Sequence, residues 1–400
     1  MNDTKSFLKK YYSYSPLLLF FISLFFGGKI VVLSLVLVVV SIIFSMVKNG
    51  FKFKKNIPLL LLIGFYIWHL IGYFYSINKG VASFDLEVKM SIILFPLLFI
   101  GIKESFLDKT LLLSKLFVFS TFIAGIVLLY FSLIHRFETG YMLYYMDYSR
   151  FLHPSYITLY LDFGIILSIY LISKTKSFLS ISLILLSIIL SLINIYFIDS
   201  KSGYIVTAVM ILFSVLFFSY SKSKLITISG LVVMVLISFF VLKNNYRFQT
   251  TYVALTNYKS AFDNPESVSS STGMRLLAWD AAIDIIEKNA IFGVGAGDIK
   301  DDLIDVYKKK NYTHLEEFKL NVHNQFLETW LGQGFIGFVL LLLVFIVPFI
   351  DAIKHKNFIL QGFLLIVFIN FMFESMLNVQ AGTVFFGFFY SFLVVLDRDE

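Results

Sequence analysis

Residues 178–198 read FLSISLILLSIILSLINIYFI, an apolar stretch with no charged side chain. A helix of this length is long enough to cross the hydrocarbon core of a bilayer, which needs about 20 residues. Similar apolar runs fill most of the chain. They lie near residues 12–26, 29–47, 57–76, 86–102, 110–134, 155–173, 203–220, 224–242, 333–350, 358–376 and 381–396. The sequence therefore predicts an all-α integral membrane protein with about twelve transmembrane helices.

The composition agrees with this fold class. Of the 400 residues, 58% are hydrophobic and 15% are charged, whereas soluble domains average about 25% charged residues. In a soluble chain the net charge of +7 would suggest a nucleic-acid partner. Here most lysines lie in short loops, where they set the orientation of a membrane protein, and we predict no nucleic-acid partner. The chain has no cysteine, which excludes disulfides.

The basic residues also predict an orientation. With the N-terminus in the cytoplasm, every predicted inner loop carries lysine or arginine, as the positive-inside rule requires. The short outer segments carry fewer basic residues, namely Lys29, Lys79, Arg136, Arg150 and Lys201. The first apolar run follows lysines but precedes no small-residue cleavage site, so we interpret it as a retained helix. Both termini are then predicted to be cytoplasmic.

One polar segment interrupts the apolar runs. It spans residues 243–331, after an N-terminal bundle of about nine helices (1–242) and before about three C-terminal helices (332–400). The predicted orientation makes this segment extracytoplasmic. Within it, residues 272–288 have the spacing of an amphipathic helix at the membrane surface, with Thr272 as its N-cap. Chemistry that needs water is expected in this segment and at the helix ends beside it.

His323 is the best candidate for a general base. It precedes Asn324 and Gln325, which we predict to bind the substrate beside it, a few residues before a predicted span. A histidine pKa lies near neutrality, and the border of the membrane provides a low dielectric constant. A purely structural histidine remains the alternative.

Several cations are predicted on the outer side, against the orientation bias. Arginine binds phosphate oxygens through two parallel hydrogen bonds, and lysine binds them as a point charge. An anionic substrate would explain these cations, while lipid headgroups or ion pairs with nearby carboxylates are the alternative. Glu374, near the outer end of a predicted helix, could meet one of them. The cations are Arg136, Arg150, Lys201 and Arg275.

Two further motifs in the polar segment leave alternatives open. Gly293-Val-Gly295-Ala-Gly297 has the wrong spacing for a dinucleotide-binding fingerprint, so it predicts a tight turn or a backbone phosphate site. The aspartates of Asp301-Asp302-Leu-Ile-Asp305 are flanked by lysines, which favours a solvated charged face over a metal site. We predict no bound metal.

Together, these features resemble the O-antigen ligase and polymerase superfamily of bacterial surface polysaccharide assembly. The resemblance rests on the topology and on three motifs, Arg275-Leu-Leu-Ala-Trp279, Ile291 to Gly297, and the block from His323-Asn-Gln to Gly334-Phe-Ile-Gly337. It implies a fold like that of lipid-linked sugar (GT-C type) transferases, in the bacterial inner membrane, with the large loop in the periplasm.

The resemblance also implies an activity. A glycan would move from undecaprenyl diphosphate to a hydroxyl of lipid A-core, a protein or another glycan, with inversion and without metal or other cofactor. His323 falls on the family's loop histidine, which activates the acceptor, and Arg275 on the arginine that holds the diphosphate. Lys201 stands where the family usually has arginine. His153 with the following proline resembles a further family dipeptide, and Trp279 could face a sugar ring.

Two alternatives to a ligase remain open. A polymerase would join lipid-linked repeat units, and the motifs do not separate it from a ligase. A polysaccharide flippase or transporter would place charged residues inside its spans, as Glu87, Lys89 and Asp162 weakly suggest. However, a transporter would not explain a long outer segment that carries histidine and arginine.

Overall fold

The computed structural model describes residues 14–51, 53–101, 110–219 and 245–396, and its regular elements in these ranges are all helices. The first half contains α2 (Ser15–Leu24), α3 (Gly28–Asn49), α4 (Ile57–Tyr75), α5 (Lys79–Val88), α6 (Met90–Phe99), α7 (Thr110–Thr139), α8 (Tyr145–Ser149), α9 (Pro154–Lys174), α10 (Phe178–Ile198) and α11 (Lys201–Ser219). The second half contains α13 (Tyr246–Thr256), α14 (Tyr258–Asp263), η2 (Pro265–Ser267), α15 (Ser271–Lys288), α16 (Ile299–Lys309), α17 (Thr313–Glu317), α18 (Gln325–Lys354), α19 (Phe358–Phe373), η3 (Met376–Asn378) and α20 (Gln380–Leu396).

The chain forms a multi-pass membrane protein. In the described ranges, 7 helices are long and apolar enough to cross a bilayer, namely α3, α4, α7, α9, α10, α11 and α18. Three apolar helices are shorter: α2, α19 and α20. The predicted span at 86–102 is wrong in extent, because this segment is divided at Lys89 between α5 and the 10-residue α6. The predicted span at 224–242 lies outside the described residues, so the count of twelve is not confirmed.

Aromatic rings hold the interior of the bundle together. Helix α9 is buried along most of its length and packs against α7, α10, α11 and α19. The Phe163 ring lies 5.2 Å from that of Phe117 and 4.9 Å from that of Phe389, in edge-to-face contacts. Such contacts stabilise aromatic pairs beyond the simple burial of their area. This packing uses several of the 47 phenylalanines in the chain.

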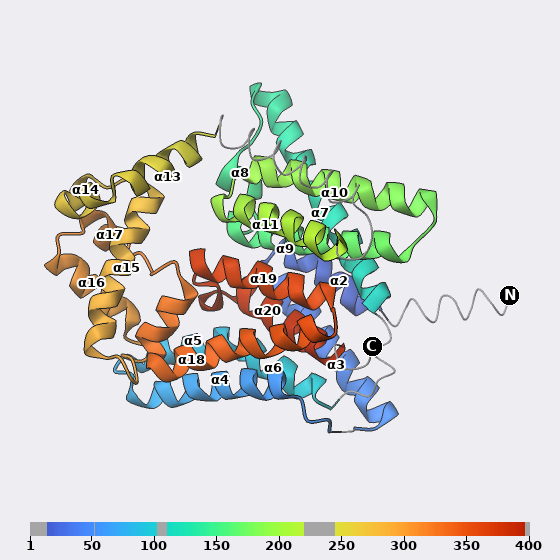
Figure 1. The fold of residues 1–400 in the computed structure, drawn as a ribbon, viewed down its shortest axis with the longest axis horizontal. Coiled ribbons are helices and arrows are strands. Elements are labelled where there is room, and N and C mark those ends of the chain that lie inside the picture. Colours follow the sequence, from blue (N-terminus) through green and yellow to red (C-terminus); the bar gives the residue numbers. More distant parts are fainter. Residues whose placement is uncertain (1–13, 52, 102–109, 220–244, 397–400) are drawn as a thin grey trace.

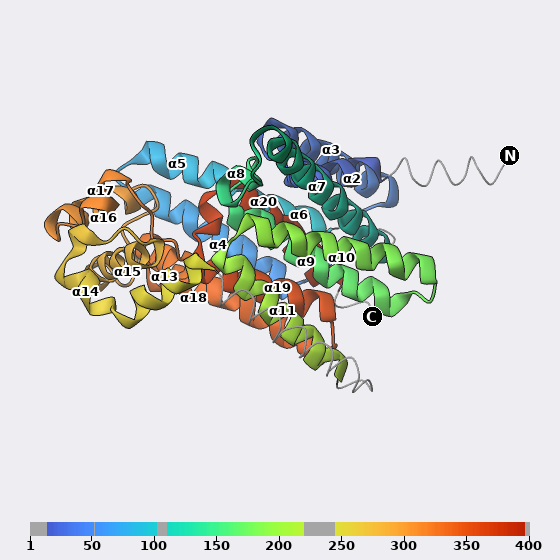
Figure 2. The same cartoon turned by 90° about the horizontal axis from the view of Figure 1, so that it is seen from above.

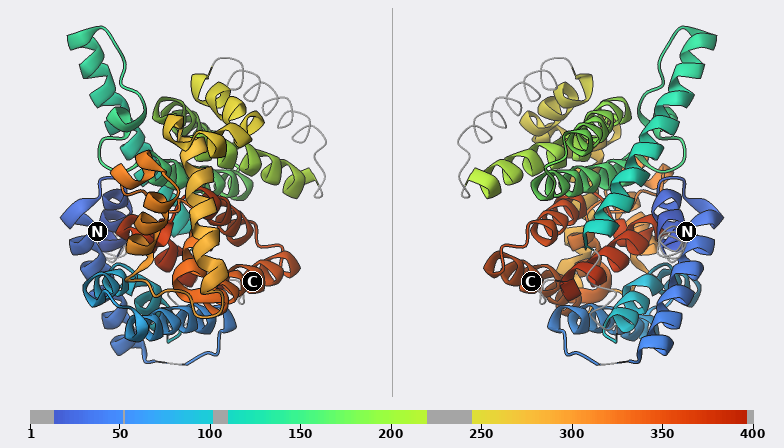
Figure 3. Two further views of the ribbon diagram at one scale, coloured as in Figure 1. Left: turned by 90° about the vertical axis from the view of Figure 1, so that its left-hand side faces the viewer. Right: turned by 90° about the vertical axis from the view of Figure 1, so that its right-hand side faces the viewer.

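Residues 245–323 form a helical cap at one end of the bundle (Figure 1, left; Figure 2). Seen from that end, helix α15 crosses in front of the bundle (Figure 3, left panel). The cap has a hydrophobic core of its own, in which Leu277 and Ala281 of α15 are buried with Leu303 and Tyr307 of α16. The apolar face of α15 therefore packs inside the protein instead of on the membrane surface. Its N-cap is Ser270, not the predicted Thr272.

The glycine motif joins the cap to a break in α18. Gly334 interrupts that helix with φ +65°. The break exposes backbone carbonyls, and those of Leu331 and Gly332 accept hydrogen bonds from the N–H groups of Val294 and Gly295, each at 2.9 Å. These two N–H groups are therefore occupied by protein, which favours the tight turn over a phosphate site. No side chain fits at Gly293, where a Cβ atom would lie 2.6 Å from the Leu331 carbonyl oxygen.

A carboxylate makes a second junction between cap and bundle. Asp298 accepts hydrogen bonds from the backbone N–H groups of Ile77 (2.7 Å) and Asn78 (2.8 Å), in the turn between α4 and α5. The Asn78 side chain also donates to Asp301, at 3.3 Å. The acidic run that begins α16 thus helps to dock the cap.

Candidate active site

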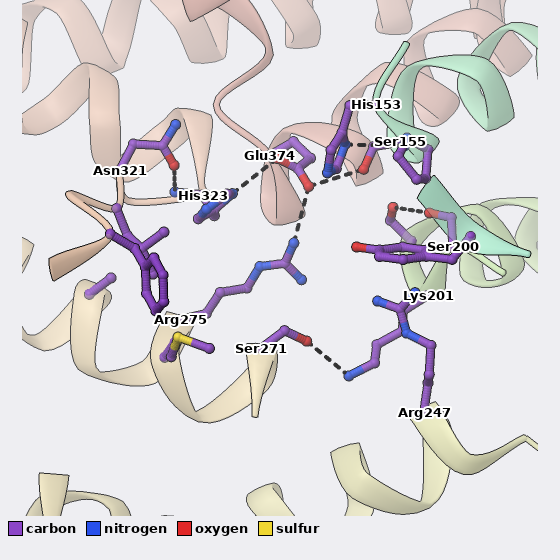
Figure 4. Close-up of a pocket in the computed structure, with 17 residues that line it drawn as sticks. His153, Ser155, Ser200, Lys201, Arg247, Ser271, Arg275, Asn321, His323 and Glu374 are labelled. Carbon is purple, nitrogen blue, oxygen red and sulfur yellow. Dashed lines mark hydrogen bonds and ion pairs between the residues drawn. The ribbon is translucent and has the colours of Figure 1, made fainter. Parts of the chain in front are cut away.

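A cavity of about 200 Å³ lies where the cap meets the bundle (Figure 4). Both regions contribute polar side chains to its wall. From the bundle these are His153, Ser155, Ser200, Lys201, Ser202 and Glu374, and from the cap Arg247, Ser271, Arg275, Asn321 and His323. The sequence predicted five of these residues as site residues, and the structure brings those five together.

Glu374 is the centre of this group. It follows the last residue of α19 and is 6% exposed. Its Oε1 accepts hydrogen bonds from Arg275 Nη2 (3.1 Å) and Ser155 Oγ (3.0 Å), and its Oε2 lies 3.1 Å from His323 Nδ1. Burial acts to raise the pKa of Glu374, but the hydrogen bond from His323 and the positive charges nearby lower it overall. The carboxylate is therefore ionised at neutral pH.

The Glu374 carboxylate determines which ring nitrogen of His323 carries the hydrogen. An ionised carboxylate only accepts hydrogen bonds, so Nδ1 must carry the hydrogen that faces it. Nε2 of the neutral ring is then left as the acceptor. The backbone of His323 is also constrained, with φ +51° and its N–H donated to Asn321 Oδ1 at 3.1 Å. A non-glycine residue in this region of φ is strained, and such strain is common at functional sites.

Three cations line the cavity around this single carboxylate. Lys201, the first residue of α11, donates to Ser271 Oγ and Thr272 Oγ1 at 3.2 Å each. Arg247 donates to the backbone carbonyl of Asp199 at 3.0 Å. Together with Arg275 these groups leave an excess of positive charge, which suits an anionic ligand.

Arg247 was not among the predicted site residues. Its guanidinium lies 3.8 Å from the centre of the Tyr145 ring, which holds it at the cavity. It falls in the predicted outer segment 243–331, so the reasoning that selected Arg275 applies to it equally. A signal for Arg247 was therefore present in the sequence.

His153 occupies the wall opposite the cap and caps a helix. Its Nδ1 accepts a hydrogen bond from the backbone N–H of Ser155 (3.4 Å), at the N-terminus of α9. Burial lowers the pKa of His153, although the charge of Glu374 opposes this effect. At neutral pH the ring is therefore uncharged. It can take part in hydrogen bonds but adds no positive charge to the cavity.

The other predicted site residues lie outside the wall of this cavity. Arg150 stacks on the Phe131 ring, 4.4 Å from its centre. Trp279 donates its indole N–H to the Val322 carbonyl (3.0 Å) and packs against the core of the cap.

Two more predicted residues flank His323 in sequence but do not line this cavity, although Gln325 lines a neighbouring one. Asn324 caps α18 by accepting from the N–H groups of Phe326 and Leu327. Gln325 is buried, and its side chain accepts from the N–H of Leu377 at 2.7 Å. Both therefore position the start of α18 and, through it, the His323 backbone.

Among the described residues, no group of three histidine, aspartate or glutamate side chains is arranged to hold a metal ion. The aspartates at the start of α16, for which a metal site was one alternative, form no such group. Burial, followed by the neighbouring carboxylates, raises the pKa of Asp302 within this run.

Comparison with known proteins shows which family this chain resembles. Residues 186–342 match the family model described as O-antigen ligase. The predicted resemblance to the O-antigen ligase superfamily is confirmed. The matched region includes Lys201, Arg247, Arg275 and His323, whereas Glu374 lies beyond it. An uncharacterized protein of Haemophilus influenzae is 23% identical over 307 residues, which cover 73% of each chain.

Proposed function

We propose that this protein is a glycosyltransferase that moves a glycan from undecaprenyl diphosphate to an acceptor hydroxyl at the outer face of the bacterial inner membrane. Both termini would lie in the cytoplasm and the cap in the periplasm. The O-antigen ligase match and the cavity between cap and bundle support this proposal. One observation carries it: Glu374 holds His323 and Arg275 together beside two further cations.

The cations would bind the diphosphate of the donor. Arg275 has several N–H donors in a planar fork, and its contact with Glu374 uses one of them. Arg247 and Lys201 add positive charge from the neighbouring walls. Negative charge grows on the diphosphate as the sugar leaves, so fixed cations stabilise the transition state more than the ground state.

His323 would act as the general base. The acceptor oxygen attacks the anomeric carbon of the donor sugar on the face opposite the diphosphate, forming a new C–O bond with inversion. The bond from that carbon to the diphosphate oxygen breaks, and undecaprenyl diphosphate leaves with the bonding electrons. The hydroxyl proton passes to Nε2 of His323. Glu374 stabilises the resulting imidazolium through the hydrogen bond at Nδ1. The sugar–diphosphate bond supplies the activation, so the transfer as proposed uses neither metal nor other cofactor.

The acceptor separates the remaining alternatives. A ligase would use a hydroxyl of lipid A-core or a protein, and a polymerase would use the sugar of a second lipid-linked repeat unit. The purified protein can be given one lipid-linked repeat unit and no other acceptor. Chain growth would identify a polymerase, whereas transfer only after addition of a separate acceptor would identify a ligase. Passage of the intact lipid-linked glycan across a vesicle membrane would instead indicate a flippase.

His323→Ala tests the proposal itself. In proteoliposomes supplied with lipid-linked donor and acceptor, we expect transfer to fall by about 10²–10⁴, the usual contribution of a general base. His314→Ala is the control, because this cap histidine lies 3.9 Å from exposed Glu317 and away from the cavity. Product would be followed by release of undecaprenyl diphosphate. Full activity in an inserted His323→Ala protein would exclude the proposed base.

A further inference from the structure

A second, larger cavity lies on the other side of His323. Its volume is about 480 Å³. Leu320, Asn321 and His323 line both cavities, so the histidine forms part of the wall between them. The remaining lining comes chiefly from α5, the start of α16 and the first turns of α18. The general base must contact the acceptor hydroxyl while the donor occupies the first cavity, so the acceptor needs a space of its own beside His323.

The second cavity has polar groups without partners. Gln333 is 2% exposed, and among the described residues neither its side-chain oxygen nor its nitrogen has a hydrogen-bond partner. The buried Oδ2 of Asp85 likewise lacks one, although Oδ1 of the same carboxylate pairs with Lys89. Buried polar atoms in proteins are almost always hydrogen-bonded. Both side chains line the second cavity, and a ligand with hydroxyl groups could complete these hydrogen bonds once the side chains turn toward it.

The charges of the two cavities differ. The first has three cations against Glu374 alone. In the second, Lys89 is already paired with Asp85, and Glu328 balances part of the remaining charge. Lys300 and Lys319 are exposed residues, where water screens their charge. The first cavity therefore suits a diphosphate, whereas the second suits a neutral polar ligand.

We propose that the second cavity binds a sugar ring of the acceptor glycan and presents its hydroxyl to His323 from the side opposite the donor. This inference rests on the proposed glycosyl transfer and assigns a binding site to the acceptor, which is the second substrate. Asp85 and the Gln333 amide would bind ring hydroxyls. Phe84, which lines the cavity and is 63% exposed, would offer an aromatic face to the ring. Glu328 already accepts from Ser375 and Asn378 and holds the wall in place.

Binding can be tested without turnover, because the chain has no cysteine. Val81→Cys places a thiol at the second cavity, on a residue that is 43% exposed, and Ser271→Cys places one at the first. Thr256→Cys, on an exposed helix end outside both cavities, is the control. The rate of modification by a maleimide reports whether each thiol is covered.

Two glycan probes distinguish the possible acceptors. One is oligosaccharide released by mild acid from the envelope glycolipid of the producing cell, and the other is oligosaccharide released from its lipid-linked repeat units. We expect at least one of them to slow labelling of Val81→Cys and to leave Ser271→Cys and Thr256→Cys unchanged. Undecaprenyl diphosphate should do the reverse and protect Ser271→Cys. If neither glycan protects Val81→Cys, the second cavity is not the acceptor site.

Steady-state kinetics give an independent test. We expect Gln333→Leu and Phe84→Ala each to raise the KM for acceptor about tenfold, the equivalent of one lost hydrogen bond or ring contact, with an unchanged KM for donor. Phe84→Ala removes an exposed side chain, so it tests the cavity even if Gln333→Leu fails to fold. A raised donor KM, or no change in either, would overturn the assignment while leaving the transfer reaction intact. Protection of Val81→Cys in a protein that transfers nothing would do the opposite: it would support the glycan site and reject the proposed function.

Discussion

The bundle and the cap are built differently, and neither holds the candidate site alone. The bundle has a continuous core of aromatic and aliphatic side chains, and it places Glu374, Lys201 and His153 at helix ends. The cap has a smaller core and is attached by hydrogen bonds, through Asp298 and the glycine turn. It contributes Arg275 and His323. The site therefore exists only when the two regions are docked, and Glu374 is the bundle residue that both cap side chains contact.

Replacing Glu374 should lower activity about as much as His323→Ala does, and more than Arg275→Lys or Arg247→Ala. Glu374→Gln keeps the shape of the side chain but removes the negative charge that orients and stabilises His323. We expect the transfer rate to fall by about 10²–10⁴, as when the carboxylate partner of a catalytic histidine is neutralised. Glu317→Gln, which changes an exposed carboxylate of the cap, is the control and should leave the rate unchanged.

The same carboxylate makes docking of the cap depend on pH. The folded pKa of Glu374 lies below its ordinary value of 4.5. Its contribution to stability is therefore complete above that value and is lost as the pH falls through the lowered folded pKa. The protection of cap amides from hydrogen exchange, taken relative to their intrinsic exchange rate at each pH, should stay constant from neutral pH to about 5 and should fall only in more acidic solution. Glu374→Gln should remove this acid-dependent step, and a step that survives in the variant would assign it to another group.

The role of Arg275 can be tested by a substitution that keeps its positive charge. Arg275→Lys retains one positive charge but loses the fork that can bind Glu374 and a diphosphate at once. We expect a loss of about 10- to 100-fold in kcat/KM for the donor, measured by release of undecaprenyl diphosphate. The acceptor KM should not change. Equal activity of the lysine variant would mean that charge alone suffices at this position.

The sequence predicted the regions of the molecule better than their junctions. Long uncharged runs are stable only inside the bilayer, so the spanning helices could be predicted from the sequence. The placement of charged residues singled out Arg275, Lys201 and Glu374. Their meeting depends on how the cap folds back, which no local pattern encodes. The same limit explains Trp279 and Arg150, whose residue types suited ligand binding although their side chains pack against protein.

The break in α18 shows a second limit. The glycine motif was visible, and both a turn and a phosphate site were open to it. Only the position of α18 decides between them, because the carbonyls that accept from Val294 and Gly295 belong to residues 331 and 332. A glycine in a sequence indicates that the backbone closely approaches another group, but it does not identify that group. Motifs of this kind need the tertiary structure for their interpretation.

Substitution of Gly293 tests whether this junction holds the cap. Gly293→Ala would place a Cβ atom 2.6 Å from the Leu331 carbonyl oxygen at a residue with φ +74°. Gly140→Ala is a matched control, because Gly140 has φ +85° but no atom within 4 Å of its Cβ position. Both variants should lose about 1–2 kcal/mol for the left-handed backbone, and Gly293→Ala should lose more. Proteolysis of the cap in detergent would measure the difference, and equal protease sensitivity would show that the clash is relieved without undocking.

The smallest expected effect on activity is the difference between substitutions of two arginines at the same end of the protein. Arg247 lines the first cavity, whereas Arg150 stacks on Phe131 away from it. Arg247→Ala should raise the donor KM about tenfold through the loss of a charge-assisted contact. Arg150→Ala should leave the donor KM within about twofold, since an exposed cation–π contact contributes only about 0.5–1 kcal/mol, and to stability rather than binding. If instead Arg150→Ala weakens donor binding as much as Arg247→Ala does, the diphosphate must reach beyond this cavity toward α8. Donor binding would then depend more on positive charge at the end of the bundle than on the junction with the cap.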